Sequence, residues 1–231
     1  MNVIITGAGR GLALELTKLH VNRGDFVFAL AHSITQDLKQ IEATSRNIKC
    51  YEADVTNETS VQKILGRIEN NTVDIIYNVA GIWYEDQMVG IADTDIDKAL
   101  MMYKVNALGP LIVIKYGEKL LKDNSLIINV SSEAGSISES ERKMEYGYCM
   151  SKAALNMASK NISNELCDRN IKVFCYHPGW MRTQMGGERA AASDLSISAK
   201  ESAECLFKIV DKGDRKSNIE YFDYLDEDWQ F

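Results

Sequence analysis

Cysteine, histidine and proline are scarce in this chain of 231 residues, which contains five, three and two of them. No C-x-x-C pair occurs and the histidines lie far apart, so the spacing of common zinc and dithiol redox sites is missing. We therefore expect no metal site, reduced cysteines and a cytoplasmic location. The absence of repeats, linkers and low-complexity segments favours a single domain over residues 1–231.

Positive charge and long apolar runs are also missing. The 26 Lys and Arg residues are outnumbered by 33 Asp and Glu residues, which gives a net charge of −7. Nucleic acids and anionic membrane surfaces attract basic patches, so this balance argues against both kinds of partner. No apolar run approaches the roughly 20 residues of a membrane span, and no export signal opens the sequence.

What the sequence does contain is a repeated alternation of short apolar runs and longer segments of helical periodicity. The apolar runs are not interrupted by regularly alternating polar residues, which is typical of strands covered on both faces. The pattern predicts a doubly wound α/β fold with a parallel, Rossmann-type sheet. The expected strands are 3–6, 26–31, 48–53, 74–77, 125–130, 173–176 and 219–221. The expected helices are 12–23, 37–44, 58–70, 93–104, 108–122, 148–168 and 199–212.

Helix ends, loops and the tail give further expectations. Asn57 is placed to cap a helix start, whereas Asn124 and Gly213 are placed to end helices. Segments 133–145 and 184–198 are polar and weakly periodic, so we expect mobile loops at the mouth of a site. The acidic tail is rich in aromatic residues, which favours packing against the domain or against a neighbouring subunit.

A glycine-rich turn, T-G-A-G-R-G-L-A at residues 6–13, joins the first expected strand to the first expected helix. Glycines allow a backbone to approach a pyrophosphate, and a helix N-terminus offers unpaired N–H donors. The turn therefore favours a dinucleotide site. The alternative interpretation is a tight turn that packs the helix on the strand without a ligand.

Tyr148 and Lys152 lie four residues apart at the start of an expected helix, so both side chains project from one face. A free phenol has a pKa of about 10, and a nearby ammonium would stabilise its phenolate, which makes Tyr148 a candidate acid/base. Tyr146 lies six residues from Lys152 and on another helical face. Two serines follow the strand 125–130, at the sheet edge where ligands bind. The S-x-x-G spacing favours Ser132 over Ser131.

Together these motifs resemble the short-chain dehydrogenase/reductase family over nearly the whole chain. In order they are Thr6-Gly7-x-x-x-Gly11-x-Ala13, Asn78-Val79-Ala80-Gly81, Val105-Asn106, Ser132, Tyr148-x-x-x-Lys152 and Pro178-Gly179-x-x-x-Thr183. Ala13 and Val79 stand where the family usually has Gly and Asn. The segments 132–137 and 177–187, with the long spacing between Ser132 and Tyr148, resemble the carbonyl-reductase-like branch that contains C-factor and sniffer type proteins.

The resemblance implies hydride transfer between NADP(H) and a small-molecule carbonyl or alcohol. It makes Tyr148 the acid/base, Ser132 the partner of the reacting oxygen, Lys152 a partner of the nicotinamide ribose, and Asn106 the holder of a relay water. The alternative for Asn106 is that it satisfies a kinked helix backbone. The implied cofactor-binding residues are Gly7, Gly9, Arg10, Gly11, Leu12, Asp54, Val55, Asn78, Ala80, Gly81, Tyr148, Lys152, Pro178, Gly179 and Thr183.

Charge at the end of the second expected strand indicates which dinucleotide binds. An acid there would accept hydrogen bonds from the free ribose and repel a 2′-phosphate, but residues 30–33 read L-A-H-S. Arg10 offers a cation to that phosphate, so NADP is favoured and NAD is the alternative. Arg10 could equally be a solvated surface charge. Asp54 also fits a turn or helix-cap role.

Rival functions use the same fold. A sensor or signalling protein would bind NADP(H) with little turnover, although it would need no proton path. An epimerase or dehydratase would need further acid/base groups, which the sequence does not offer. The family resemblance implies a homodimer or homotetramer through helices 108–122 and 148–168. Candidates for the substrate pocket wall are Trp83, Tyr84, Glu85, Trp180, Met181 and Met185.

Overall fold

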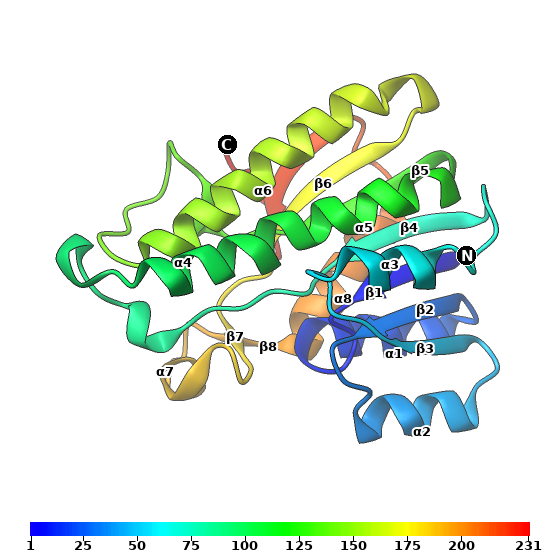
Figure 1. Cartoon of the computed structure of the whole chain (residues 1–231), viewed down its shortest axis with the longest axis horizontal. Coiled ribbons are helices and arrows are strands. Elements are labelled where there is room, and N and C mark those ends of the chain that lie inside the picture. The colour runs from blue at the N-terminus through cyan, green and yellow to red at the C-terminus, as the bar shows by residue number, and fades with distance from the viewer.

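The computed structural model describes all residues, 1–231, and contains a central seven-stranded parallel sheet (Figure 1). The strand order is β3-β2-β1-β4-β5-β6-β9, and every neighbouring pair in it is parallel. The strands are β1 Asn2–Thr6, β2 Phe26–Ala31, β3 Ile48–Glu52, β4 Val73–Asn78, β5 Leu121–Val130, β6 Lys172–His177 and β9 Ile219–Asp223. The prediction of a doubly wound parallel sheet is confirmed.

Helices cover both faces of this sheet. The helices are α1 Gly11–Arg23, α2 Gln36–Thr44, α3 Glu58–Leu65, α4 Ile96–Tyr103, α5 Gly109–Gly117, α6 Tyr146–Glu165, α7 Gly187–Ala191 and α8 Ala199–Lys212. Apolar residues of α1, α2 and α8 form one core with the sheet, and those of α3, α5 and α6 form the other. No helix combines the length and the apolar character that a bilayer crossing requires.

The two cores explain why the strands lack alternation. Successive residues of β1 point to opposite faces: Val3 and Ile5 enter one core and Ile4 enters the other. All three are completely buried, and burying such a side chain contributes about 1.5–3 kcal/mol. Both faces of the central strands must therefore be apolar.

Several helix boundaries differ from the expectation. The expected helix 58–70 ends at Leu65, and the expected helix 93–104 begins only at Ile96. The expected helix 108–122 ends at Gly117, and β5 begins four residues later. Asn124 therefore lies inside β5, in a left-handed conformation, and does not end a helix. The reason is tertiary: Leu121 is completely buried and pairs with Val73 of β4.

Two expected helix ends are confirmed, whereas one expected loop is partly ordered into a helix and a strand. The Asn57 side chain accepts a hydrogen bond from the Ser60 backbone and caps α3, and Gly213 ends α8 in the left-handed conformation. The expected loop 184–198 contains the short helix α7, and its end forms β8 Ile197–Ser198, which pairs with β7 Met181–Arg182. Pieces this short leave no periodic pattern in a sequence.

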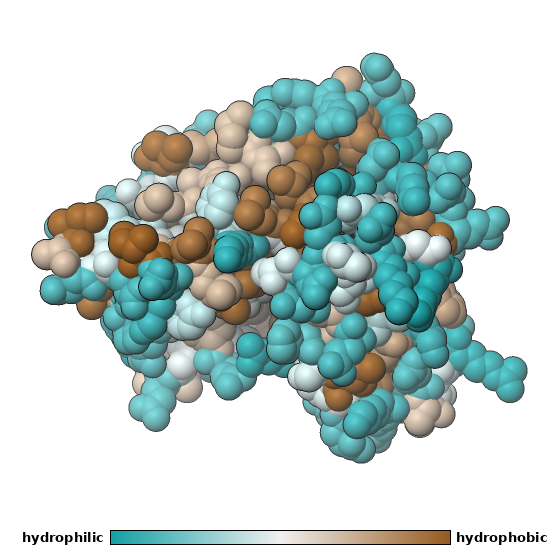
Figure 2. All heavy atoms as spheres, in the orientation of Figure 1, coloured by the Kyte–Doolittle hydropathy of each residue, from teal (hydrophilic) through white to brown (hydrophobic).

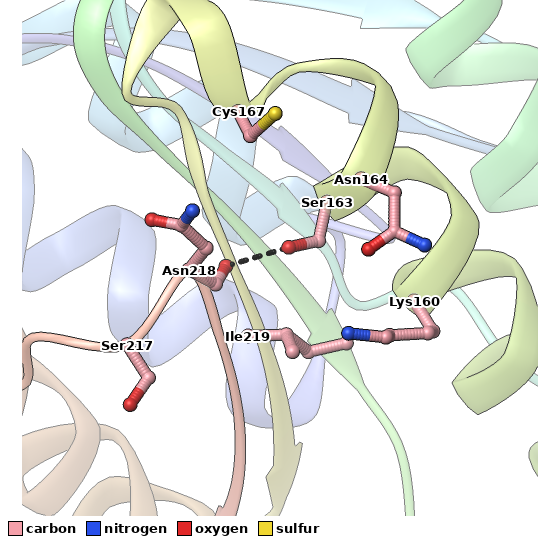
Figure 3. A pocket seen from close by; sticks show the side chains of 7 residues that line it. All are labelled: Lys160, Ser163, Asn164, Cys167, Ser217, Asn218 and Ile219. Carbon is pink, nitrogen blue, oxygen red and sulfur yellow. Dashed lines mark hydrogen bonds between the residues drawn. The ribbon is translucent and has the colours of Figure 1, made fainter.

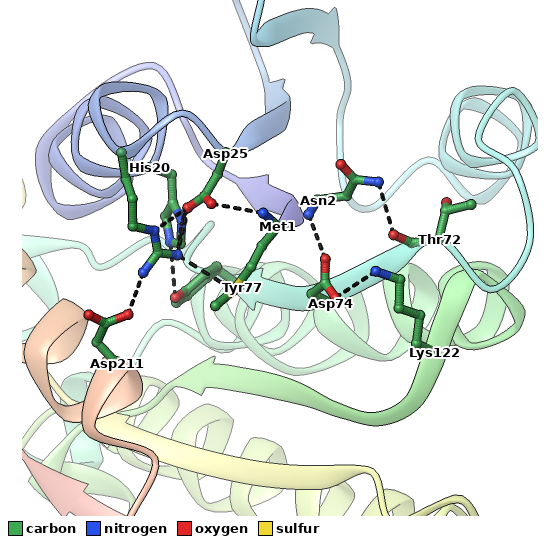
Figure 4. A network of polar contacts seen from close by, with 10 residues as sticks. Met1, Asn2, His20, Asp25, Thr72, Asp74, Tyr77, Lys122 and Asp211 are labelled. Carbon is green, nitrogen blue, oxygen red and sulfur yellow. Dashed lines mark hydrogen bonds and ion pairs between the residues drawn. The ribbon is translucent and has the colours of Figure 1, made fainter.

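A polar network, here called the amino-end network, lies near the starts of β1 and β2 (Figure 4). The Asp25 carboxylate accepts hydrogen bonds from the Met1 amino group at 2.9 Å, His20 Nδ1 at 2.7 Å and Arg23 Nε at 2.6 Å. His20 Nε2 lies 3.1 Å from the hydroxyl of Tyr77 in β4. This network ties the end of α1 to two strands.

Candidate active site

The glycine-rich turn packs against the end of β4. Gly7 adopts the left-handed conformation, and a Cβ there would lie 2.9 Å from the Cα of Ala80. Close packing therefore accounts for Gly7. The start of α1 is different: its first turn has neither a capping side chain nor an acidic residue. The backbone N–H groups at this helix start, near Gly11 and Leu12, can therefore bind an anionic group.

Arg10 and Gly9 connect this turn to neighbouring segments. The exposed Arg10 guanidinium donates to Gln184 Oε1 in the loop before α7, and Thr35 Oγ1 donates to the Gly9 carbonyl at 3.1 Å. The exposed residues that follow β2 are His32 and Ser33. The end of β2 therefore places no carboxylate beside the turn.

Asp54, which follows β3, forms a local turn. Its Oδ1 accepts hydrogen bonds from the backbone and the hydroxyl of Thr56, each at 2.8 Å, which is a local turn. Val55 is buried against the start of α5, where a Cβ on Gly109 would lie 2.9 Å from its side chain.

The residues at the end of β4 have three different surroundings. The buried Asn78 amide donates to Asn129 Oδ1 of β5 at 2.8 Å, so its side chain belongs to a network within the sheet. Ala80 borders the glycine-rich turn. Gly81 borders the catalytic candidates, because a Cβ there would lie 3.3 Å from Asn106 Oδ1 and 3.9 Å from Lys152 Nζ.

Lys152 is buried on α6. Its Nζ donates to the Val130 carbonyl at 2.8 Å and lies 5.7 Å from the centre of the Tyr148 ring. Burial lowers the pKa of Lys152 to about 8, and no carboxylate pairs with it. The ammonium is therefore poised to lose a proton more readily than an ordinary lysine.

Tyr148 lies beside Lys152, as predicted, whereas Tyr146 is exposed. The expected lowering of the phenol pKa by Lys152 is not seen. Burial, with a contribution from the Glu133 carboxylate, raises the pKa of Tyr148 to about 12, and the Ser132 hydroxyl opposes the rise. The phenol is therefore held in its protonated form.

Asn106 lies in a wide, π-type turn, Lys104–Leu108, between α4 and α5. Its Oδ1 accepts from the Ile82 backbone at 2.8 Å, and its Nδ2 donates to the Ile82 carbonyl at 2.9 Å and to Ser151 Oγ at 3.0 Å. The side chain thus joins the loop after β4 to α6. Such wide turns are frequent at functional sites.

The two serines after β5 have different surroundings. The buried Ser131 hydroxyl donates to Asn156 Oδ1 at 2.6 Å, which is an internal contact. The Ser132 hydroxyl donates to Glu133 Oε2 at 2.6 Å and accepts from the Ala134 backbone at 3.2 Å. The Ser132 hydroxyl also interacts with the Tyr148 phenol, whereas the Ser131 hydroxyl is engaged inside the domain.

Charged residues that the sequence reasoning missed surround these groups. Arg142 donates to Glu133 from Nε at 2.9 Å and also bonds Glu145, while Trp83 Nε1 donates to Glu145 at 2.6 Å. All of these groups lie outside the family motifs. A polar loop between two motifs gives no spacing rule from which such pairs could be found.

The segment after β6 completes the site. The Pro178 carbonyl accepts from Ser202 Oγ at 2.8 Å, and Gly179 is left-handed, with a Cβ position only 2.8 Å from the ring of Tyr224. The Thr183 methyl lies 3.6 Å from where a Cβ on Gly11 would lie. This segment therefore reaches the glycine-rich turn at Gly11.

The aromatic tail packs on the same region. Tyr221 donates to the Ser132 carbonyl, and Ser136 Oγ donates to the Gln230 carbonyl at 2.6 Å. The Trp229 ring meets that of His177 edge-on, with centres 5.7 Å apart. The tail thus packs against the domain and supports the loop that carries Ser132.

A separate hollow of about 370 Å³ lies at the start of β9 (Figure 3). Its walls include Lys160 and Cys167, and Ser163 Oγ donates across it to the Asn218 carbonyl at 3.0 Å. It contains no acid/base pair. No group of three or more His, Cys, Asp or Glu side chains is arranged to hold a metal ion anywhere in the structure.

Comparison with known proteins identifies the family. Residues 1–194 match the family model described as short chain dehydrogenase, and the chain belongs to this family of oxidoreductases. The chain is 28% identical over 211 residues to 1-hydroxy-2-glutathionyl-2-methyl-3-butene dehydrogenase of Rhodococcus sp. (strain AD45), covering 90% of each. It is 31% identical over 157 residues to C-signal of Myxococcus xanthus, covering 66% of this chain and 89% of that protein.

Solved structures give the same result. The carbonyl reductase Sniffer of D. melanogaster aligns with a TM-score of 0.89 at 26% identity, covering 100% of this chain and 99% of that one. A carbonyl reductase from Pseudomonas aeruginosa in complex with NADP aligns with a TM-score of 0.83 at 25% identity, with the same coverage. The predicted resemblance to this family and to its carbonyl-reductase-like members is confirmed.

Proposed function

We propose that this chain is an NADP(H)-dependent oxidoreductase that interconverts a carbonyl group and an alcohol in a small molecule. The observation that carries the proposal is the meeting of Ser132, Tyr148, Lys152 and Asn106 beside an uncapped glycine-rich turn. Acid/base groups and an anion-binding helix end are the two parts that hydride transfer to a carbonyl requires.

The residues present fit a bound NADP(H). The uncapped start of α1 would receive the pyrophosphate, and Arg10 would receive the 2′-phosphate, with no carboxylate after β2 to repel it. Pro178, Gly179 and Thr183 would border the nicotinamide, and Asp54 and Val55 would border the adenine. Ala80 and Gly81 would border the cofactor directly, and Asn78 would position this segment, since its amide nitrogen donates to Asn129 within the sheet. The carbonyl reductases of known structure that bind NADP support this choice.

Bound NADPH would supply the hydride. Ser132 and Tyr148 would hold the carbonyl oxygen, and Tyr148 would give its phenolic proton to that oxygen as negative charge develops there. A phenol pKa of about 12 keeps this proton in place at neutral pH, so the site is prepared to act as an acid. Lys152, with its pKa of about 8, would return a proton, and Asn106 would hold the path to solvent.

A screen of carbonyl compounds that follows NADPH absorbance tests the proposal. Tyr148→Phe should reduce turnover by about 100-fold or more because the proton donor is lost, while NADPH binding changes little. Tyr146→Phe is the matched control and should retain activity. Tight NADPH binding without turnover of any carbonyl would favour the rival function, a cofactor sensor.

The proposal extends to assembly as a homodimer or homotetramer. Apolar side chains are exposed over α4, α5 and α6, and Figure 2 shows apolar surface gathered on this face. The exposed residues are Ile96, Leu100, Met101, Leu111, Met150 and Met157. Several exposed apolar side chains on one face are typical of an interface between proteins. A single monomeric species in sedimentation would contradict the assembly.

A further inference from the structure

The Ser132 hydroxyl already has an acceptor. It donates to Glu133 Oε2 at 2.6 Å, and a hydroxyl has one hydrogen to donate. In the proposed function that hydrogen must point to the substrate oxygen. Ser132 can make the second contact only by leaving the first, so Glu133 Oε2 must lose its donor whenever the substrate binds.

A carboxylate in this position needs a replacement donor. Glu133 is only 27% exposed at its side chain, and Arg142 Nε holds its other oxygen, Oε1, at 2.9 Å. Leaving Oε2 without a donor would oppose substrate binding, because a largely desolvated anion depends on its hydrogen bonds.

His177 is placed to be that donor. Its Nδ1 is buried, has no hydrogen-bond partner, and lies 3.5 Å from Glu133 Oε2. The register of the sheet causes this proximity, since Val130 of β5 pairs with Tyr176 of β6. The ring of Trp229 packs edge-on against the imidazole and limits its movement.

We propose that Glu133 and His177 are positioning residues for Ser132. Glu133 orients the Ser132 hydroxyl, and His177 Nδ1–H donates to Glu133 Oε2 in its place when that hydroxyl turns to the substrate oxygen. The role in catalysis rests on the proposed function. No proton leaves the set in this exchange, because one hydrogen bond replaces another.

The surrounding charges are compatible with a neutral imidazole donor. Burial lowers the pKa of His177, and Arg142 and Lys152 act in the same direction, whereas Glu133 and Asp223 oppose the decrease. A neutral imidazole carries one N–H, and placing it on Nδ1 leaves Nε2 as an acceptor.

Two substitutions at one position test the kinetic part. In His177→Asn the amide nitrogen can occupy the place of Nδ1, whereas in His177→Gln the amide lies near the place of Nε2 and the Nδ1 donor is lost. We expect His177→Gln to reduce kcat/KM for the carbonyl by about tenfold and His177→Asn to retain most of it, with unchanged NADPH affinity.

The same pair is then measured in the Glu133→Gln background, where no carboxylate needs a donor. The difference between the two His177 variants should fall below about twofold there, since the coupling has been removed. An equal loss in both variants, or a difference that stays undiminished in the Glu133→Gln background, would show that His177 acts only through packing. Unfolding midpoints identify variants that fail to fold.

A second measurement needs no turnover. In Ser132→Ala the serine donor is absent, so His177 should bond Glu133 permanently, and its pKa measured by NMR should shift upward from that in the unchanged chain. The pKa of His20, which lies in the amino-end network, should not change. An unchanged or lower His177 pKa would refute the exchange. If the chain reduces no carbonyl at all, the proposed function fails and this titration alone decides the hydrogen-bond exchange.

Discussion

The two polar clusters of this molecule use similar groups to opposite effect. In the amino-end network, burial favours the neutral form of Asp25, but hydrogen bonds from Arg23, the terminal amine and His20 outweigh it and lower the pKa of Asp25 to about 2. In the active-site cluster, Lys152 has a single carbonyl acceptor, and burial lowers its pKa to about 8. Complete pairing fixes a charge, whereas incomplete pairing leaves a proton free to move.

The difference suggests that one cluster stabilises the fold and the other transfers protons. Three donors surround Asp25, which lies directly before β2, at the end of the sheet away from the glycine-rich turn. The active-site cluster sits where β4, β5 and β6 end. Substitutions should therefore separate stability from activity.

The largest effect is expected from Lys152→Met, which keeps the length of the side chain and removes the ammonium. Turnover should fall by about 10²–10⁴-fold because the proton path and a proposed ribose contact are both lost. Steady-state kinetics and NADPH fluorescence measure the two parts. Near-normal turnover would contradict the division between the clusters.

A loss of stability without loss of activity is expected from Asp25→Asn. Replacing the carboxylate weakens three charge-assisted hydrogen bonds and should reduce the free energy of unfolding by about 2–4 kcal/mol. Denaturant unfolding measures the change. The kcat/KM of the folded variant should remain within about twofold of that of the unchanged chain. A large kinetic defect would show that the two clusters are functionally coupled.

The amino-end network also predicts how stability depends on pH. Burial lowers the pKa of His20 to about 4 despite the opposing effect of Asp25. The unfolded chain, with a histidine pKa of about 6.5, therefore binds a proton first as the pH falls. His20 should reduce the free energy of unfolding by about 3 kcal/mol between pH 7 and pH 4. In His20→Gln this part of the pH dependence should disappear.

The smallest effect sharpens the assignment of the cofactor. Arg10→Ala should weaken NADPH binding by about tenfold and NADH binding by less than about twofold, because only NADPH carries the 2′-phosphate. Gln184→Ala, which removes the partner of Arg10 in the loop, is the control and should spare this preference. Equal losses of affinity for both nucleotides would indicate that Arg10 is only a solvated surface charge.

The parts of the fold that the sequence predicted best are those governed by burial. β2 and α8 have the expected bounds because their apolar patterns are set by the two cores. The predicted end of α5 was wrong because Leu121 pairs with Val73, and local periodicity does not reveal a contact between distant residues. The motif residues Tyr148 and Lys152 were placed together correctly.

The site residues that the sequence did not reveal share one property. Glu133 and His177 lie far apart in the chain and share no spacing, but both lie at the ends of adjacent strands of the sheet. Because β5 and β6 are neighbours in the sheet, the polar residues that follow β5 and end β6 lie side by side. Ion pairs such as that of Arg142 with Glu145 depend on side-chain directions within a loop, which no pattern specifies.

The wide turn at Lys104–Leu108 lets α4 and α5 serve two different neighbours. A π-type turn contains one residue more than a regular helical turn, so side chains beyond it are rotated by about 100° around the axis. Ala99 of α4 can thus meet Gly147 of α6 while Val113 of α5 enters the core under the sheet. Deleting one residue here would turn α5 by about 100° relative to α4, so that only one of the two could keep its present neighbour.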